Sequence, residues 1–306
     1  MNYGLLNTLM EISEWYAPEC RSLFLPDAFM KPGMWSALAA FMDKNKVPPQ
    51  QIEWGNKNLR SYAQTLKLEE VLGYNPSQDL NRPNEDNTYT PLVRLNQRGD
   101  GRATANLIGN FLLERVNKQE HPGILELVKV IGELFDNVEA HGCSPAFGCA
   151  QIYQGQEIEF ALVDYGIGFL EEIKSSRQSG VASSHREAID WCLQEGTSTK
   201  EVEDEWAQQI PHSSSVEQQT QTGNHHQGLG LYEFQQLAAS YNASLYIASG
   251  DCVLGMSQGG QREYNEIPEW RGVALSCSFH VQDLTKAQAG QMTSEETQRI
   301  MDRIRL

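Results

Sequence analysis

The chain has 306 residues, of which 40% are hydrophobic and 9% aromatic, and its formal net charge at pH 7 is -16. These values are typical of globular domains, and the negative charge argues against nucleic acid or an anionic membrane as a partner, because both are bound through clustered Lys and Arg. No stretch approaches the roughly 20 apolar residues that span a bilayer, and residues 1–16 lack the basic segment of a secretory signal. Six cysteines without a CxxC pair favour reduced thiols. We therefore expect a cytoplasmic protein.

The first part of the chain alternates short strands and helices. The predicted strands cover residues 23–25 and 51–54, and the predicted helices cover residues 34–42 and 59–66. Such alternation in a small unit favours an α/β arrangement, and the layout resembles the STAS-like domain that precedes the ATPase domain in some bacterial proteins. Phosphorylated STAS domains carry Ser or Thr after an Asp at a strand–helix turn. Here Asp27 is followed by Ala28 and Phe29, so we expect no phosphate acceptor.

A polar segment at residues 77–101 divides the chain, interrupted by a strand candidate at residues 89–95. We predict a small α/β domain at residues 1–87, a larger domain at residues 88–285 and a C-terminal helix at residues 286–306. A capping box, Thr293-Ser294-Glu295-Glu296, marks the start of that final helix.

The larger domain combines helices and strands. Helices are predicted at residues 103–116, 123–141, 187–195 and 231–241, and strands at residues 148–153, 157–164, 243–249 and 272–281. The strands at 148–153 and 157–164 are expected to form a hairpin. Residues 250–271, rich in Gly and polar groups, are expected to form a long connection between the last two strands.

The second helix of this domain carries a carboxylate and a carboxamide one turn apart. Glu133 and Asn137 are four residues apart, and this spacing places both on the same face of the helix. A carboxylate can hold a water molecule, and a carboxamide oxygen can bind a hard cation such as the magnesium of a nucleotide. Asp136 directly precedes Asn137, and His141-Gly142 follows one turn later.

Two glycine motifs follow in the chain. Asp164-Tyr165-Gly166-Ile167-Gly168 comes directly after the apolar strand that contains residues 160–163. Gly228-Leu229-Gly230-Leu231 opens a helix, where free backbone N–H groups suit phosphate oxygens and glycine permits close approach.

In this order, the three motifs resemble the ATP site of the gyrase, chaperone, histidine-kinase and mismatch-repair (GHKL) ATPase superfamily. The resemblance implies an α+β fold of the Bergerat type, in which a mixed sheet is covered by helices on one face. It implies that Glu133 orients or deprotonates the attacking water, that Asn137 binds magnesium and that Asp164 accepts a hydrogen bond from the adenine amino group. The nucleotide-binding residues it implies are Asp136, Asn137, His141, Asp164, Gly166, Gly168, Gly228, Leu229, Gly230 and Leu231.

The resemblance also implies a mobile lid over the nucleotide. Residues 196–227 match this segment, since they are rich in Gln, Ser, Thr and His and contain few apolar residues. The family often places a Gly-Thr pair at the start of a late strand, where the Thr contacts adenine. Gly272-Val273 occupies that place here, and Ser276 or Ser278 is a candidate substitute for the Thr.

Several functions are compatible with such a site. The first is an ATPase that acts as a nucleotide-dependent switch on a protein partner or within a homodimer. The second is a protein serine kinase of the anti-sigma type, in which a similar His-Gly pair ends the same helix. The third is a nucleotide-dependent scaffold without turnover. A sensor histidine kinase is disfavoured, because the first histidine of the chain is His121.

Overall fold

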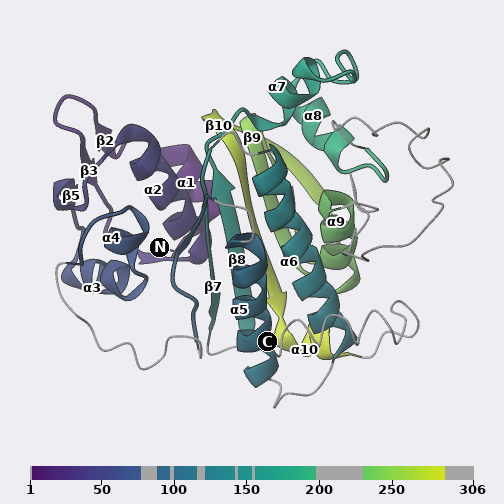
Figure 1. Cartoon of the computed structure of the whole chain (residues 1–306), viewed down its shortest axis with the longest axis horizontal. Coiled ribbons are helices and arrows are strands. Elements are labelled where there is room, and N and C mark those ends of the chain that lie inside the picture. The colour runs from purple at the N-terminus through teal and green to yellow at the C-terminus, as the bar shows by residue number, and fades with distance from the viewer. Residues whose placement is uncertain are drawn as a thin grey trace, which may run out of the picture.

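The computed structural model describes residues 2–76, 88–96, 100–115, 121–141, 144–153, 156–197 and 230–286. Gly142, Gly228, Leu229, nearly all of the predicted lid and the predicted C-terminal helix lie outside these ranges, as do the side chains of Asp136 and His141. The described residues form an α+β structure with one large sheet between two groups of helices (Figure 1). None of the helices in these ranges is long and apolar enough to cross a membrane.

Within the described residues, the large sheet has five strands in the order β6-β7-β8-β10-β9. Their bounds are β6 (Val93–Leu95), β7 (Ala146–Ile152), β8 (Glu157–Asp164), β9 (Ser244–Met256) and β10 (Arg262–His280). Each of the pairings described for these strands is antiparallel, so the expectation of a mixed sheet is wrong. β8 and β9 run in the same direction, but they are not neighbours. β10 turns back after β9 and lies between them, so it is antiparallel to both.

The expected long connection at residues 250–271 is also wrong. β9 continues to Met256 and β10 begins at Arg262, with these two residues paired across the ladder. The ladder continues with two irregularities from Glu266 to Val273. The first residues of β10 are mostly exposed. An exposed pair of strands carries polar side chains, and because loops do too, the sequence pattern did not distinguish the two.

One face of the sheet is covered by helices of the larger predicted domain (Figure 1). These are α5 (Asp100–Arg115), α6 (Pro122–His141), α7 (Gly168–Ser175), α8 (His185–Cys192), α9 (Gly230–Ser240) and α10 (Val281–Thr285). The apolar stripe of α6 is fully buried at Ile124, Ile131 and Phe135. The rings of Phe135 and Phe160, the latter on β8, pack edge to face with their centroids 5.9 Å apart. The predicted helices of this region are confirmed, with ends that differ by a few residues.

The opposite face is covered too, which the family resemblance did not imply. Here lie α1 (Leu5–Glu11) and α2 (Pro32–Asn45), and α2 is buried on nearly all sides. Their apolar side chains form one cluster with Phe147, Val163 and Ala274 of the sheet. The helices of the larger predicted domain cover one face, as expected, and the N-terminal helices α1 and α2 cover the other. The physical reason is visible in β7 and β8, where nearly every residue is buried, because a strand that is apolar at consecutive positions must be covered on both sides.

Helix α2 is fixed at its beginning to the middle of the sheet. The buried carboxylate of Glu159, on β8, accepts a hydrogen bond from the backbone N–H of Gly33 at 3.3 Å. Lys31 lies directly before the helix, and its Nζ is 3.2 Å from Glu159 Oε2. These contacts hold the first turn of α2 against the strand that ends at Asp164.

Residues 2–76 are called the N-terminal unit below. Besides α1 and α2 it contains η1 (Pro49–Gln51), α3 (Lys57–Thr65), α4 (Leu68–Val71) and the short strands β1 (Asn2–Tyr3), β2 (Tyr16–Ala17), β3 (Ser22–Phe24), β4 (Phe29–Met30) and β5 (Ile52–Glu53). β1 pairs with β4, and β3 pairs with both β2 and β5. The predicted strands and helices of this region are confirmed, whereas the STAS-like layout and the boundary at residue 87 stay predictions.

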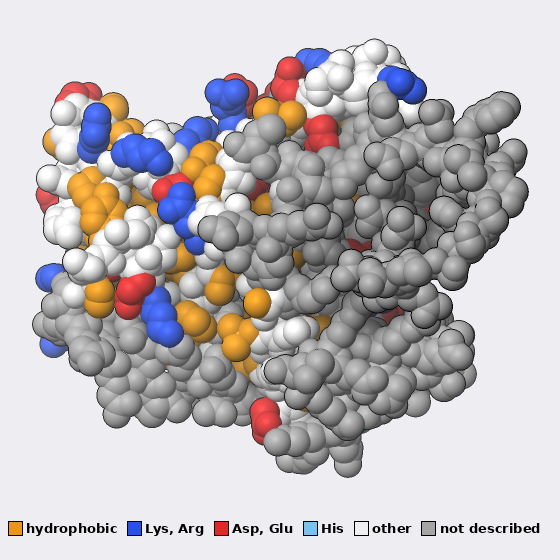
Figure 2. Space-filling view, in the orientation of Figure 1, with side chains coloured by type: hydrophobic (Ala, Val, Ile, Leu, Met, Phe, Trp, Pro, Cys, Tyr) orange, Lys and Arg blue, Asp and Glu red, His pale blue; other side chains and the backbone are white. Residues whose placement is uncertain are grey.

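The surface of the N-terminal unit carries isolated apolar side chains. Figure 2 shows them on the left, scattered among basic, acidic and neutral groups. Phe24 and Phe29 are about half exposed. Single exposed apolar residues are ordinary on protein surfaces, and they carry no functional assignment here.

Candidate functional site

A solvent-open cavity lies between the large sheet and the helices of its first face. Its volume is about 990 Å³, counted out to the solvent at its mouth. Three segments that are far apart in the sequence meet in its walls. The predicted site residues that line it are Asn137, Asp164, Gly166, Gly168, Gly230 and Leu231. The structure thus brings together members of all three motifs.

The first and third motifs touch directly. A Cβ built on Gly230, the first residue of α9, would lie 2.7 Å from Asn137 Nδ2 and 3.6 Å from Glu133 Cβ. The start of α9 therefore approaches α6 at the two side chains predicted to act on the nucleotide. Glu133 lies beside this contact, although it is not among the residues that line the cavity.

Glu133 has a basic neighbour that the sequence interpretation did not single out. Its side chain is 15% exposed, and Oε1 lies 3.8 Å from Lys129 Nζ. The same amine is 3.2 Å from Glu233 Oε2 on α9. Lys129 precedes Glu133 by one helical turn, which is the signal in the sequence that could have identified it. The amine connects α6 and α9 where the two helices approach.

Asp164 ends β8 with its carboxyl group in the cavity wall. Oδ1 accepts hydrogen bonds from the backbone N–H of Gly166 at 2.8 Å and of Val273 at 3.2 Å. Burial raises the pKa of Asp164 to about 6; the two backbone donors oppose this rise, and Glu172 adds to it. A carboxyl group with this pKa is mostly ionised at neutral pH and loses its charge in mild acid.

Two glycines near Asp164 are required by contacts within the protein. Gly272 has φ of +109°, and an added Cβ would lie 2.5 Å from the backbone oxygen of Asp164. Gly168 has φ of +76°, and an added Cβ would lie 2.8 Å from Ser249 Oγ. The Ser249 hydroxyl accepts from the Phe169 N–H and donates to the Gly272 carbonyl. Gly168, which the resemblance counts among the nucleotide-binding residues, is thus already explained by the packing of the loop against β9 and β10.

Neither serine suggested as a substitute for the family's threonine reaches the cavity. Side chains alternate between the two faces of a strand, and Val273 and Leu275 of β10 line the cavity. Ser276 and Ser278 fall on the alternate positions and are absent from its described lining. The Ser278 hydroxyl instead donates to Glu157. Both suggestions are wrong, and the contact of β10 with Asp164 is the backbone N–H of Val273.

Helices α7 and α8 and the residues after α8 supply further lining residues, which sequence reasoning did not assign to the site. They are Phe169 and Glu172 of α7, Trp191 and Cys192 of α8, and Thr197. Burial raises the pKa of the Cys192 thiol to about 12, so it is a neutral wall group at physiological pH. Helix α8 was predicted, but its distance from every motif left no signal that it faces the same cavity.

Among the residues that the structure describes, no three His, Cys, Asp or Glu side chains are grouped so as to hold a metal ion. Comparison of the chain with family models, with curated proteins and with solved structures found no match.

Proposed function

We propose that the chain binds magnesium and ATP in this cavity and acts as an ATPase of the GHKL type, with a Bergerat-type larger domain. In this proposal the nucleotide controls contacts to a protein partner or to a second copy of the chain. One observation carries the proposal. Asn137, the Asp164–Gly168 loop and Gly230 come from three separate segments and line one cavity, which is the grouping that the three motifs predict.

Asp164 is proposed as the group that recognises adenine. Two backbone donors already bind Oδ1, so Oδ2 is the oxygen that a donor in the cavity would reach. The amino group of adenine can donate to a carboxylate, whereas the O6 of guanine is an acceptor and would be repelled. Trp191 and Phe169 add apolar surface to the same cavity, and an aromatic base is expected to pack favourably against them.

The phosphates are proposed to lie toward α6 and α9. The N-terminus of α9 offers backbone N–H groups beginning at Gly230, and helix N-termini favour anions. The Asn137 carboxamide lies beside it and would supply an oxygen ligand, and the Glu133 carboxylate lies one turn away on α6. This oxygen-donor set fits magnesium, which takes few protein ligands and keeps several waters. The ion would supply charge neutralisation of the phosphates, and Glu133 would accept the proton of the attacking water.

Following the γ-phosphate tests this function and separates it from its alternatives. The full-length protein is incubated with magnesium and γ-labelled ATP, alone and with candidate partner proteins. Release of inorganic phosphate supports the ATPase. Label on a protein serine instead identifies a kinase, and nucleotide binding without either product identifies a scaffold. Absence of nucleotide binding would refute the site itself.

Asp164→Asn is expected to weaken ATP binding by about 1.5–3 kcal/mol, the range for a lost hydrogen bond to a charged group. Calorimetric titration of the variant and the parent protein with ATP and with GTP measures this loss and the base preference. Asp251→Asn is a matched control, because Asp251 is an exposed carboxylate on β9 outside the described lining of the cavity. Equal affinity of the parent protein for ATP and GTP would contradict the role of Asp164.

The raised pKa of Asp164 predicts two opposite effects of pH. The carboxylate must be ionised to accept from the adenine amino group, so ATP affinity should fall as the pH is lowered through about 6. The Asp164 contribution to the stability of the nucleotide-free protein should instead increase as the pH is lowered. Because the pKa of this acid is higher in the folded state than the ordinary 3.8, the folded state binds more protons between about pH 4 and about pH 6. The Asp164 contribution to the free energy of unfolding therefore rises as the pH falls through this range.

Both effects should disappear in Asp164→Asn, which has no carboxyl group at this position. Calorimetry and urea unfolding across the pH range, performed on both proteins, measure them. The difference between the two proteins cancels the titration of the nucleotide phosphates and of the other carboxyl groups. Parallel pH profiles in the two proteins would show that Asp164 does not titrate in contact with the base.

A further inference from the structure

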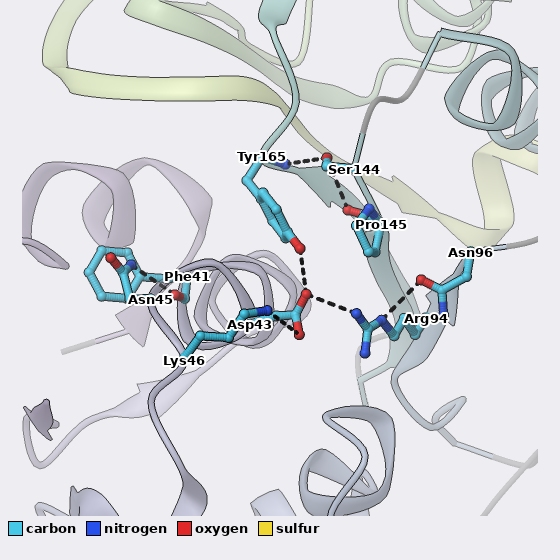
Figure 3. Close-up of polar contacts among 9 residues, drawn as sticks. All are labelled: Phe41, Asp43, Asn45, Lys46, Arg94, Asn96, Ser144, Pro145 and Tyr165. Carbon is cyan, nitrogen blue, oxygen red and sulfur yellow. Dashed lines mark hydrogen bonds and ion pairs between the residues drawn. The ribbon is translucent and has the colours of Figure 1, made fainter.

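Tyr165 lies between Asp164 and Gly166 in the sequence, but its side chain points away from the cavity. Figure 3 shows its ring extending toward α2, where the hydroxyl donates to Asp43 Oδ2 at 2.5 Å. Asp43 belongs to the last turns of α2, and its side chain is 8% exposed. A hydrogen bond thus joins the Asp164–Gly168 loop to the N-terminal unit across 122 positions of the chain.

Asp43 is held in place for this contact by basic groups. Arg94 Nη2, from β6, lies 3.0 Å from the Asp43 Oδ2 that also receives the Tyr165 hydroxyl (Figure 3). Arg94 Nε donates to Asn96 at 3.0 Å, and Lys46 Nζ lies 3.8 Å from Asp43 Oδ1. A carboxylate that is nearly buried and ion-paired has little freedom to move, so it is a defined anchor for the tyrosine.

The backbone of the same loop is held by further contacts from the large sheet and from the segment before β7. The indole N–H of Trp270 donates to the Asp164 carbonyl at 3.0 Å, and Trp270 packs in the apolar cluster that includes α1 and α2. The backbone N–H of Tyr165 donates to Ser144 Oγ at 3.3 Å. The carboxylate of Asp164 faces the cavity while its carbonyl and the next side chain are held from the opposite side. The Tyr165–Asp43 hydrogen bond is the contact through which a displacement of α2 would act on the residue next to the carboxylate.

We infer that Asp43 and Tyr165 are positioning residues that couple α2 to the adenine end of the cavity. Resting on the proposed function, this inference identifies the N-terminal unit as a part of the chain that responds to the nucleotide. Coupling between two sites is reciprocal. If the position of α2 affects the affinity for adenine, bound adenine must stabilise the position of α2 by the same free energy. The anchoring of α2 at its beginning to β8, through Gly33 and Glu159, confines this response to the end of the helix.

The test measures affinities of full-length variants for ATP and GTP by calorimetry. Tyr165→Phe and Asp43→Ala are each expected to weaken ATP binding about fivefold or more, the lower end of typical coupling between sites. The double variant should bind ATP no more weakly than the weaker-binding single variant, because both changes remove the same Tyr165–Asp43 hydrogen bond. Asp43→Asn keeps an oxygen that can accept from the tyrosine hydroxyl, so it should bind ATP more tightly than Asp43→Ala. This rescue separates positioning from a general loss of stability.

Tyr3→Phe is the matched control. The Tyr3 hydroxyl donates to Glu11 Oε2 at 2.6 Å, so the variant loses a tyrosine–carboxylate hydrogen bond inside the same N-terminal unit. It should keep the ATP affinity of the parent protein. If Asp43→Ala fails to fold, Tyr165→Phe and Asp43→Asn still supply the comparison.

Hydrogen exchange gives a second readout on α2. Bound ATP should slow exchange at the end of Pro32–Asn45 in the parent protein and in Tyr3→Phe, and this protection should be lost in Tyr165→Phe. The coupling is refuted if Tyr165→Phe and Asp43→Ala bind ATP as tightly as the parent protein and bound ATP leaves the exchange rates in α2 unchanged. A parent protein that binds no ATP refutes the proposed function instead, so the two failures are distinguishable.

Discussion

Replacement of Glu133 by alanine is expected to slow ATP turnover by about 10²–10⁴-fold, the range for losing a general base, while ATP remains bound. Glu133 lies beside the start of α9 and next to Asn137 on α6, where the proposed site places the phosphates. Its side chain is 15% exposed, so water can reach it beside the start of α9. Equilibrium binding of labelled ATP and release of inorganic phosphate are measured on the same sample.

Two further variants show whether the loss is specific. Glu126→Ala removes a carboxylate from the same helix, two turns before Glu133, where it accepts from the Tyr241 hydroxyl at 3.2 Å. This variant should keep its turnover. Asn137→Ala should weaken the magnesium-dependent part of ATP binding, in contrast to Glu133→Ala. Unchanged turnover in Glu133→Ala would exclude Glu133 as the base.

Replacement of Gly272 by alanine is expected to destabilise the fold and remove ATP binding together. An added Cβ would lie 2.5 Å from the Asp164 backbone oxygen, 2.6 Å from Asp164 Oδ1 and 2.7 Å from the Gly166 nitrogen. The last two atoms are partners in the hydrogen bond that holds the carboxylate. Strain at positive φ costs about 1–3 kcal/mol, and inserting a methyl group into a packed site costs a similar amount. Together these effects lower the free energy of unfolding by about 2–6 kcal/mol.

Gly259→Ala separates the two causes. Gly259 also has positive φ, +94°, but no atom lies within 4 Å of its added Cβ. The control should therefore show the backbone strain alone and keep its ATP affinity. Urea unfolding gives the stabilities, and calorimetry on the folded fraction gives the affinities. Equal destabilisation in the two variants, with ATP binding retained in both, would show that the Asp164 loop accommodates the methyl group.

Local patterns predicted the elements that carry the candidate site. The apolar stripe of α6 and the strand before Asp164 are strong periodic signals, and the helix after Gly230 begins where a glycine-rich segment ends. The grouping of Asn137, Asp164 and Gly230 came from the family resemblance, and the cavity agrees with it. The lining residues Glu172 and Trp191 were missed. Helix α7 begins at Gly168, but no spacing in the sequence indicates that Glu172 lines the cavity, and none relates α8 to the motifs.

Features that the sequence interpretation missed or misassigned have physical causes, mainly in the large sheet. Its second covered face was present in the sequence as the uninterrupted apolar run at residues 160–163, a pattern typical of strands buried on both sides. Ser276 and Ser278 of β10 were suggested as substitutes for the threonine of the family, but side chains alternate along a strand. Because Val273 and Leu275 face the cavity, the two serines face the other side of the sheet. The bond from Tyr165 to Asp43 joins residues 122 positions apart, and no local pattern contains such a pair.

The shared apolar cluster under the sheet limits how this protein can be divided. Phe147, Val163 and Ala274 are completely buried, and α1 and α2 belong to the same cluster. A fragment without residues 2–76 would present this face to water, where a broad apolar surface promotes aggregation. The N-terminal unit is thus unlike a regulatory module that can be removed, exchanged or joined to another catalytic domain through a linker. Any change of sequence at this face must be accommodated by both parts of the chain, so the two are expected to evolve as a pair.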